Sequence, residues 1–418
     1  MTDVRLLFAT RIVRMFGYGF LAVVLVLYLA AIGLDGGRIG LLLALTLAGD
    51  TLISLFLTTR ADRLGRRRVL IVGALLMIGG AVVFLATDLF PLLLLGATIG
   101  VISPSGNEVG PFLPVEQASL SQTVSDDRRT GLFAWYNLGG SVATAVGALT
   151  AGLVAQAIQS SGATVVDSYR AIVAVYAGLG LVMALLFSRL GAAIEPPPLH
   201  QTVGRLGLGR SRSAVLRLSA LFSLDAFAGG LVPLSILAFW FHTRWAVEPA
   251  VLGAIFFGAN ILAAVSALSA ARLARRFGLI NTMVFTHLPS NILLLLVPLM
   301  PTLQLAVIVL LARFSISQMD VPTRQSYTMA VVEPDERSAA AGVTSIARTT
   351  GAAASPIIAG PLVANPALAP LTFVVAGGLK IVYDLLLWRS FRAHPAPGEG
   401  PPPTPPPSPT VRSPATPG

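Results

Sequence analysis

Thr58-Thr-Arg-Ala-Asp-Arg-Leu-Gly-Arg-Arg-Arg-Val-Leu70 is a short cationic stretch between two long apolar runs. Five arginines and one aspartate fall within the nine positions from Arg60 to Arg68. A segment with this charge stays out of the hydrocarbon core of a bilayer, because an ionised side chain is costly there. The stretch therefore predicts a short polar loop between two membrane spans, and its charge indicates the side of the membrane on which the loop lies.

The composition is that of a membrane protein. Of 418 residues, 55% are hydrophobic and only 11% are charged, whereas a soluble domain carries about 25% charged residues. The apolar runs are too long and continuous for the alternating pattern of a membrane β-barrel. We therefore predict an all-α polytopic membrane protein with twelve transmembrane helices, each of roughly 20 residues. They are expected near 12–33, 38–59, 69–87, 91–119, 131–158, 169–190, 214–242, 249–271, 280–299, 302–330, 337–363 and 367–391.

The arginines also predict the orientation of these spans. Few lie in the loops on one side, whereas the other side carries the 60–68 stretch, the 189–217 connection and a cluster at 272–276. Cytoplasmic loops of membrane proteins carry this kind of excess. We therefore expect both termini in the cytoplasm and the protein in the cell (plasma) membrane, the inner membrane of a bacterium. The run 15–32 lacks a clear cleavage site and is expected to be an uncleaved first helix.

Several classes of function are excluded by the same observations. The formal charge of +10 would suit a nucleic-acid partner, but the arginines lie between spans and form no soluble basic face. The absence of cysteine rules out disulfides and thiolate metal sites, and four scattered histidines predict no metal site. No P-loop and no cluster of nucleophile motifs is visible, so we expect neither an enzyme nor a cofactor.

A weak internal repeat relates the two halves of the chain. Gly40 matches Gly253 and Gly65 matches Gly278, both at an offset of 213 residues. The acidic–arginine pair 127–128 matches the pair 336–337 at an offset of 209. Parallel repeats of this kind are a known transporter plan, in which the substrate binds at the interface of the repeats.

The repeat and the polar segments predict four regions. A six-helix bundle is expected over 1–190, followed by a cytoplasmic connection over 191–213 that contains Glu195 and several arginines. A second six-helix bundle is expected over 214–392. Residues 393–418 are rich in proline and small polar residues, which predicts a disordered cytoplasmic tail.

Asp62-Arg-x-Gly-Arg-Arg67 resembles the loop motif of the major facilitator superfamily, usually written G-x-L-A-D-R-x-G-R-R. Thr58 and Arg60 depart from that pattern, and Ala274-Arg-Arg-Phe-Gly278 is similar to a degenerate second copy. The resemblance covers about residues 5–392 and implies two pseudo-symmetric six-helix bundles. It implies a monomeric secondary transporter, of bacterial type, that moves a small molecule by alternating access. It also implies a conformational latch, closed when the transporter faces outward, formed by Asp62, Arg63, Gly65, Arg66 and Arg67.

Two carboxylates within predicted spans are candidates for a coupling proton, since the proton gradient is the expected energy source. Ionisable groups inside spans usually face a cavity or a partner. Asp50 lies in the second span and Glu108 in the fourth. The alternative for Asp50 is a structural acid bonded to Thr51, Ser54 or a neighbouring helix.

The fourth and tenth spans carry the best candidates for a substrate cavity. Prolines and glycines at 104–114 predict a broken helix, and irregular backbone at membrane depth commonly lines a cavity. In the tenth span, Asp320 and Arg324 are spaced to pair on one face, whereas Arg313 is more isolated and could meet Glu108 or an anionic substrate. The alternative for the fourth span is a kink that only shapes packing. The cavity candidates are Ser105, Asn107, Glu108, Arg313, Gln318, Asp320 and Arg324.

Other polar residues receive lower priority. Asp225, Asn260 and Arg348 are lesser cavity candidates, and Lys380 is expected to form a structural pair with Asp384, four residues later. His242 and His287 are expected to be peripheral.

The preferred function is proton-coupled efflux of a small molecule by alternating access. Buried Arg and Glu side chains also permit proton-coupled uptake or export of a small anionic metabolite. A membrane sensor on the same scaffold, without transport, is the second alternative, although the sequence shows no soluble output domain.

Overall fold

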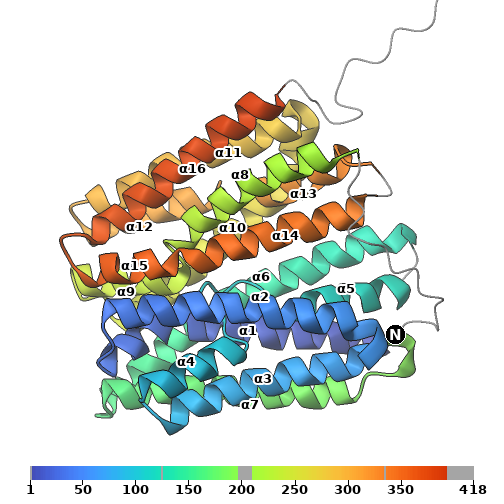
Figure 1. Ribbon diagram of the computed structural model, residues 1–418. Helices are drawn as coiled ribbons and strands as arrows, with labels where there is room; N and C mark the ends of the chain where they lie inside the picture. The colour runs from blue at the N-terminus through green and yellow to red at the C-terminus, as the bar shows by residue number, and fades with distance from the viewer. Residues whose placement is uncertain (1, 124–125, 196–209, 334–335, 393–418) are drawn as a thin grey trace, which may run out of the picture.

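The computed structural model describes residues 2–123, 126–195, 210–333 and 336–392, apart from the side chains of residues 2, 62, 121–131, 134 and 337–339. The described part is helical throughout, which confirms the predicted fold class. Figure 1 shows two layers of helices, the first formed by α1–α7 and the second by α8–α16. We refer to them as the N-terminal and C-terminal halves; the domain boundaries given above stay a prediction.

The N-terminal half contains α1 (Thr2–Ala31), α2 (Gly36–Leu64), α3 (Arg66–Ala86), α4 (Phe90–Ile99), α5 (Phe112–Thr123), α6 (Asp126–Ser160) and α7 (Val165–Ser188), and a short 3-10 helix, η1 (Ala192–Ile194), follows it. The C-terminal half contains α8 (Arg212–Gly230), α9 (Leu234–Trp245), α10 (Pro249–Phe277), α11 (Leu279–Leu296) with the 3-10 turn η2 (Val297–Leu299), α12 (Leu303–Phe314), α13 (Asp320–Ala330), α14 (Arg337–Ala354), α15 (Pro356–Ala364) and α16 (Ala369–Phe391).

These elements make twelve crossings, because four spans are broken into two helices each. Within the described residues, nine segments are long and apolar enough to span a membrane, with α8 and α9 together forming one of them. The other three crossings consist of the shorter pairs α4–α5, α12–α13 and α14–α15. The break in the fourth span was expected. The breaks before α9 and α15 were not: we predicted one helix over 214–242, which Pro233 interrupts, and one over 337–363, which is divided at Ser355.

The cationic stretch is not the loop that the sequence suggested. α2 continues to Leu64 and α3 begins at Arg66, so a single residue, Gly65, separates the two helices. Arginine and leucine are good helix formers and extend α2 beyond its apolar part. Gly65 turns the chain with φ 93°, and its repeat equivalent Gly278 does the same between α10 and α11 with φ 82°.

The other glycine pair of the repeat marks the closest crossings between the halves. A Cβ on Gly40 of α2 would lie 2.3 Å from the Pro356 carbonyl oxygen of α15. A Cβ on Gly152 of α6 would lie 2.2 Å from the Pro249 carbonyl oxygen and 3.0 Å from the Gly253 Cα of α10. Equivalent glycines therefore allow backbone-to-backbone contact at two places, which confirms that the repeat has structural meaning.

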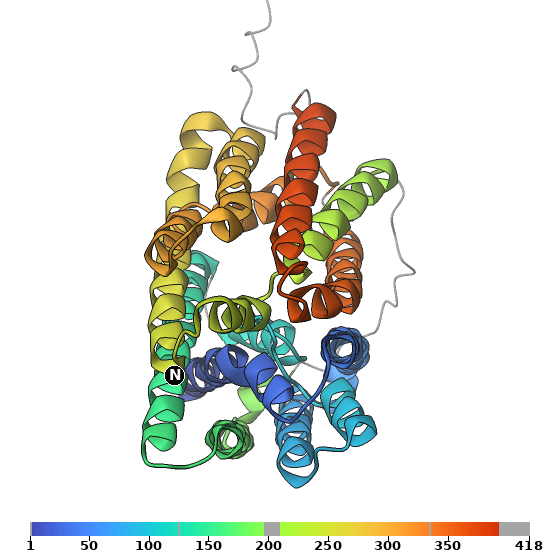
Figure 2. The same ribbon diagram turned by 90° about the vertical axis from the view of Figure 1, so that its left-hand side faces the viewer.

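The two halves meet at the end of the molecule opposite Gly65. α9 packs on α1, α15 packs on α2, and the start of α10 packs on α6. Figure 2 looks onto this closed end, with α9 and α15 between the two halves. In Figure 1 the halves diverge toward the end that carries the N-terminus and the end of α16. The first and last described residues thus lie at the same end, as an even number of spans requires.

Candidate functional site

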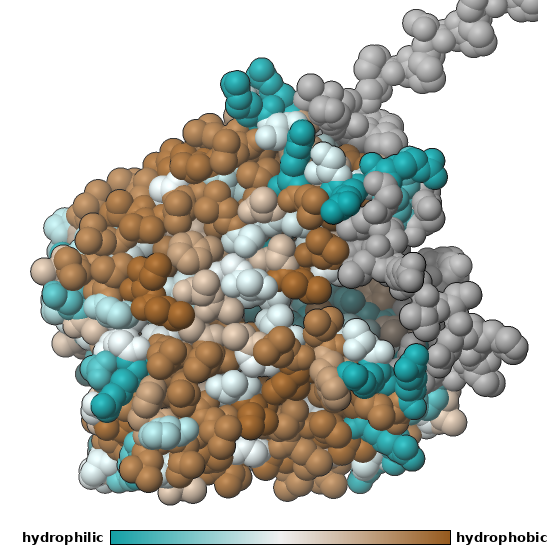
Figure 3. Space-filling model, viewed as in Figure 1, coloured by the Kyte–Doolittle hydropathy of each residue, from teal (hydrophilic) through white to brown (hydrophobic). Residues whose placement is uncertain are grey.

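A cavity of about 620 Å³ lies between the two halves. Figure 3 shows a broad apolar surface on both halves and hydrophilic residues in the hollow between them, on the right-hand side. All candidates from the fourth and tenth spans line the cavity, and so does Asp50 of α2. The structure therefore brings the two broken spans together, although the roles of these residues stay predictions. They are joined by residues given lower priority: Asp225, Asn260, His287, Arg348 and Lys380.

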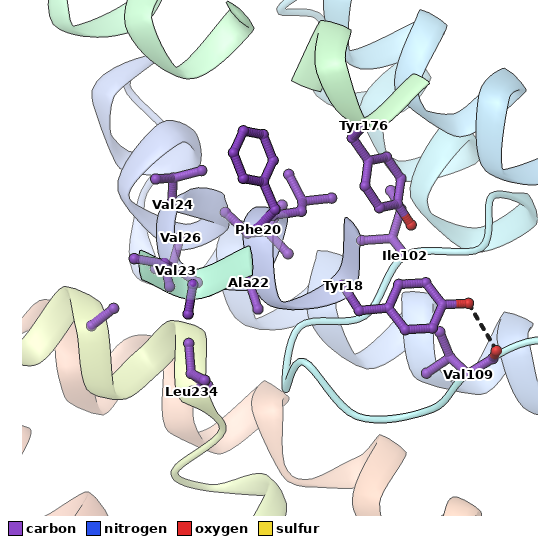
Figure 4. Packing of buried hydrophobic residues seen from close by; sticks show 14 of the residues in the cluster. Tyr18, Phe20, Ala22, Val23, Val24, Val26, Ile102, Val109, Tyr176 and Leu234 are labelled. Atoms are coloured by element: carbon purple, nitrogen blue, oxygen red, sulfur yellow. Dashed lines mark hydrogen bonds between the residues drawn. The ribbon is translucent and has the colours of Figure 1, made fainter. Parts of the chain in front are cut away.

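The non-helical segment 100–111 of the fourth span forms part of the cavity wall. Two of its backbone carbonyl groups accept hydrogen bonds from side chains on other helices. The Tyr18 hydroxyl donates to the Val109 carbonyl oxygen at 3.0 Å, and the Tyr176 hydroxyl donates to the Val101 carbonyl oxygen at 2.6 Å. Figure 4 shows both tyrosines pointing toward this segment from neighbouring helices. These bonds make the irregular backbone tolerable at membrane depth, because no backbone polar group can be left unpaired there.

The same segment also contacts the C-terminal half. The Ser235 backbone N–H, at the start of α9, donates to the Pro104 carbonyl oxygen at 3.2 Å. The broken fourth and seventh spans are therefore joined by a backbone hydrogen bond close to the closed end. No feature of the sequence pointed to this contact, because it requires the unexpected break before α9.

A buried ion-pair network joins α1 to the fourth span. The Arg14 guanidinium, fully buried, binds both carboxylate oxygens of Glu116 at 2.8 and 2.6 Å. Its Nε also donates to Glu108 at 2.7 Å, and Arg11 binds the other oxygen of Glu108. Tyr136 and Thr10 complete the coordination of Glu116. α1 is thus bound to the non-helical segment and to α5, which follows it.

This network corrects the pairing suggested for Glu108. Arg313 is not its partner; Arg11 and Arg14 of the same half are. Arg11 and Arg14 were given no role in the sequence analysis, because they precede the apolar run 15–32. Their spacing of three residues on one helix face, together with two acids in a broken span, was the available signal.

Asp225 of α8 is the centre of a second charged network, in the C-terminal half. Its carboxylate lies 2.5 Å from Lys380 Nζ, 3.2 Å from an Arg324 nitrogen and 3.8 Å from an Arg348 nitrogen. Arg324 also pairs with Asp320 at 3.0 Å, as the sequence predicted. The network links α8, α13, α14 and α16 just beside the breaks in the seventh and tenth spans.

Two predictions for this region were wrong. Lys380 pairs with Asp225 and not with Asp384, because the two residues of α16 have partners on different helices. Asp384 instead binds His287 Nδ1 at 2.8 Å and Asn291 Nδ2 at 2.9 Å. His287 is therefore a buried residue at the cavity and is not peripheral.

Arg313, on α12, is the least satisfied cation of the cavity. In the described part of the chain no ion pair links it to a carboxylate, and its buried Nε has no hydrogen-bond partner. The guanidinium carbon lies 5.0 Å from the centre of the Phe314 ring. Arg348 is similar: among the described residues its buried Nη1 has no hydrogen-bond partner, and it lies 3.8 Å from Asp225 Oδ2. Both side chains therefore have hydrogen-bonding capacity to offer a ligand.

Asp50 faces the cavity from the N-terminal half with neutral partners. Its Oδ1 accepts the Gly110 backbone N–H at 2.7 Å and the Ser54 hydroxyl at 3.4 Å. No ion pair to Asp50 is present among the described residues. The expected bond to Ser54 is thus accompanied by a bond to the broken fourth span. A carboxylate in this setting can be neutral or charged without leaving a cation unpaired.

The latch candidates lie away from the cavity, at the open end. The backbone N–H groups of Arg66 and Arg67, which begin α3, donate to the Glu195 carboxylate at 2.7 and 3.1 Å. The side chain of Arg67 binds the Ser188 carbonyl oxygen at the end of α7. Arg63 is exposed at the end of α2, and the Asp62 side chain lies outside the described residues. These contacts stay within the N-terminal half, and the role as a latch stays a prediction.

Residues 7–356 match the family model of the Major Facilitator Superfamily. The chain belongs to this superfamily. The match covers most of both halves and confirms the resemblance seen in the 62–67 motif.

Known proteins of similar sequence or structure agree with this assignment. The uncharacterized membrane protein YJR124C of Saccharomyces cerevisiae is 29% identical over 417 residues, covering 92% of this chain and 93% of that protein. The structure is similar to that of the nucleoside transporter NupG, with a TM-score of 0.72 and 15% identity, over 94% of this chain and 100% of NupG. It is also similar to a D-xylose–proton symporter, with a TM-score of 0.70 and 15% identity, over 92% and 97% of the two chains. Likeness at this identity shows a shared fold.

The superfamily and the fold identify the chain as a multi-pass membrane protein and a secondary transporter, not an enzyme. Among the described residues no cluster of His, Asp or Glu could hold a metal ion.

Proposed function

We propose that the chain is a proton-coupled transporter of a small anionic organic solute, which it moves by alternating access through the central cavity. The observation that carries this proposal is the unpaired Arg313 in the cavity wall, supported by the loosely paired Arg348. A buried cation is costly when it lacks a partner, so an anionic ligand between the two arginines would stabilise the site.

The other sequence-based candidate, efflux of an apolar drug-like compound, fits the cavity less well. In addition to His287, its walls carry six basic or acidic side chains from the C-terminal half and two acids from the N-terminal half: Asp225, Arg313, Asp320, Arg324, Arg348, Lys380, Asp50 and Glu108. An apolar solute would leave these groups without water and without new partners. The proposal therefore follows the alternative given in the sequence analysis, proton-coupled uptake or export of a small anionic metabolite.

We place the arginine-rich end in the cytoplasm of a cell-membrane protein, following the excess of arginine in those loops. In that orientation the conformation described here faces inward, because the halves meet at the opposite end. The cavity lies within a single chain, which supports a monomer as the functional unit.

The proposal is tested by flux measurements in proteoliposomes. With an imposed pH gradient, labelled carboxylates and phosphate esters are expected to move, and a proton-sensitive dye should report the accompanying proton flux. Flux of neutral or cationic lipophilic dyes without any anion flux would contradict the anionic cargo. Anion flux that ignores the pH gradient would contradict proton coupling.

Arg313→Gln is expected to weaken solute binding and leave the fold intact. Loss of a buried charged contact costs about 2 kcal/mol or more, which is roughly a 30-fold rise in the apparent Km for the transported anion. Arg313→Lys should recover part of this loss because it restores the charge. Arg244→Gln, at an exposed arginine outside the cavity, is the control. Equal Km values for the two glutamine variants would remove Arg313 from the site.

Asp50→Asn is expected to uncouple transport from the proton gradient. The amide cannot bind or release a proton, but it retains an oxygen that can accept from Gly110 and Ser54. Gradient-driven accumulation should therefore be lost, whereas solute exchange across the membrane without a gradient continues. Asp88→Asn, in an exposed ion pair with Arg170, should change neither assay. Retained accumulation in the Asp50 variant would show that the coupling proton binds elsewhere.

A further inference from the structure

We propose that His287 binds a second proton, on the wall of the cavity opposite Asp50, and that this proton strengthens the binding of the anionic solute. The inference deepens the proposed function and rests on its anionic cargo. It arises from the position of the imidazole between a cavity-lining carboxylate, Asp225, and a fully buried one, Asp384.

The contacts of His287 indicate which ring nitrogen can exchange a proton. Nδ1 lies 2.8 Å from Asp384 Oδ1 and donates to it when that carboxylate is ionised, because an ionised carboxylate only accepts. Asn291 Nδ2 donates to the second oxygen of Asp384 at 2.9 Å, which holds that carboxylate in place. A histidine whose one nitrogen donates to a carboxylate has its tautomer set, and only Nε2 is left to gain or lose a proton.

Nε2 points toward the charged network of the cavity. It lies 3.9 Å from Asp225 Oδ1, which is also the oxygen that Lys380 binds. A proton taken from cavity water would convert the ring to imidazolium, with Nδ1–H kept on Asp384 and Nε2–H directed at Asp225. On release the proton returns from Nε2 to cavity water. His287 lines the cavity while being only 4% exposed, so water reaches it from that side.

The ionisable groups around His287 come from four other helices. α8 contributes Asp225, α16 contributes Lys380, Tyr383 and Asp384, α13 contributes Asp320 and Arg324, and α14 contributes Arg348. Three carboxylates and three cations balance one another in this group, with His287 neutral. Protonation of His287 therefore leaves the group with a net positive charge.

That added charge lies beside the arginines proposed to hold the solute. Arg348 belongs to the same network through Asp225, and Arg313 lines the same cavity. When imidazolium shares the Asp225 carboxylate, the cations are less neutralised and attract an anion more strongly. By linkage, a bound anion must favour protonation of His287 to the same degree. Proton and anion would thus bind together on this wall.

The proton site can be observed without knowing the solute. Full-length protein with isotope-labelled histidine, in lipid nanodiscs, would be studied by NMR over a pH series. The sequence contains four histidines, so His287→Gln identifies the His287 signals by their loss. If that variant does not fold, replacement of the other three histidines leaves His287 alone. We expect its ring signals to shift as the pH is lowered, as on imidazolium formation. Unchanged signals over the whole pH series would overturn the proposal.

Two variants sharpen the result. Asp225→Asn removes the carboxylate that faces Nε2, so the same change should require a lower pH; an unmoved transition would contradict the proposed contact. His242→Gln is the matched control, because His242 Nδ1 contacts the Val247 carbonyl oxygen at 2.9 Å outside the cavity. It should leave the His287 transition unchanged.

Failure of this inference is distinguishable from failure of the proposed function. If the His287 signals do not change with pH in a protein that still moves anions on a pH gradient, only the second proton site is overturned. A titrating His287 in a protein without anion flux supports the proton site but removes its link to an anionic cargo.

Discussion

Arg14→Met is expected to cause the largest loss of stability of any single substitution considered. Arg14 is fully buried and binds Glu108 and Glu116 together, so among the described residues its removal leaves Glu116 without a paired cation and Glu108 with Arg11 alone. Breaking a buried pair by removing one partner costs about 3–5 kcal/mol. Unfolding of membrane proteins is commonly irreversible, so the practical measurement is the apparent Tm and the half-life at elevated temperature in detergent.

A second substitution separates the lost ion pair from the lost packing. Arg14→Met combined with Glu116→Leu removes both charges of the fully buried pair, and it should recover much of the lost Tm, because an apolar replacement of a buried pair is often neutral. The surface control is Arg38→Ala, whose 3.4 Å pair with Asp35 is more than half exposed on both sides. Such a pair contributes about 0–1 kcal/mol. A Tm loss for Arg14→Met no larger than for Arg38→Ala would contradict the structural role of the network.

Gly360→Ala is expected to shift the conformational equilibrium of the transporter. A Cβ on Gly360 would lie 2.2 Å from the Gly36 carbonyl oxygen and 2.6 Å from the Gly40 Cα, both backbone atoms of the opposite half. The closed end can accommodate it only if α2 and α15 separate. Overpacking of this kind costs about 1–3 kcal/mol, which corresponds to a roughly 5- to 150-fold change in the ratio of two states.

The shift can be measured directly because the chain has no cysteine. Spin labels on cysteines introduced at the exposed positions Thr59 of α2 and Ala341 of α14 would report the separation of the halves toward the open end. In Gly360→Ala we expect the distance distribution to move to shorter values and the transport rate to fall. Gly378→Ala in α16 is the matched control, since a Cβ there meets no atom within 4 Å. Identical distributions for the two alanine variants would show that this crossing does not hold the end closed.

The sequence predicted the break in the fourth span, whereas it predicted the charged pairs around the cavity only in part. Pro104, Pro111 and the neighbouring glycines act on their own helix, so the break in the fourth span was visible locally. The pairing of Lys380 with Asp384 rested on the same four-residue spacing as the pairing of Asp320 with Arg324. It is wrong because α16 lies against α8 and α11, which supply Asp225 and His287 as closer partners. Partners on other helices have no fixed spacing in the chain, and the sequence cannot rank them.

The arginine-rich stretch shows the same difference between features that local sequence determines and contacts that depend on the tertiary structure. Its charge and its similarity to Ala274–Gly278 by themselves determined a polytopic membrane protein of two related halves, since hydropathy and repeats are properties of local sequence. Only Gly65 separates α2 from α3, because the charged residues after the apolar run also favour a helix and extend α2 to Leu64. Only the tertiary structure decided which charges satisfy one another and which, like Arg313, are left facing the cavity. The physical reason is that burial makes each charge depend on the groups within a few ångströms, and these come from helices far apart in the chain.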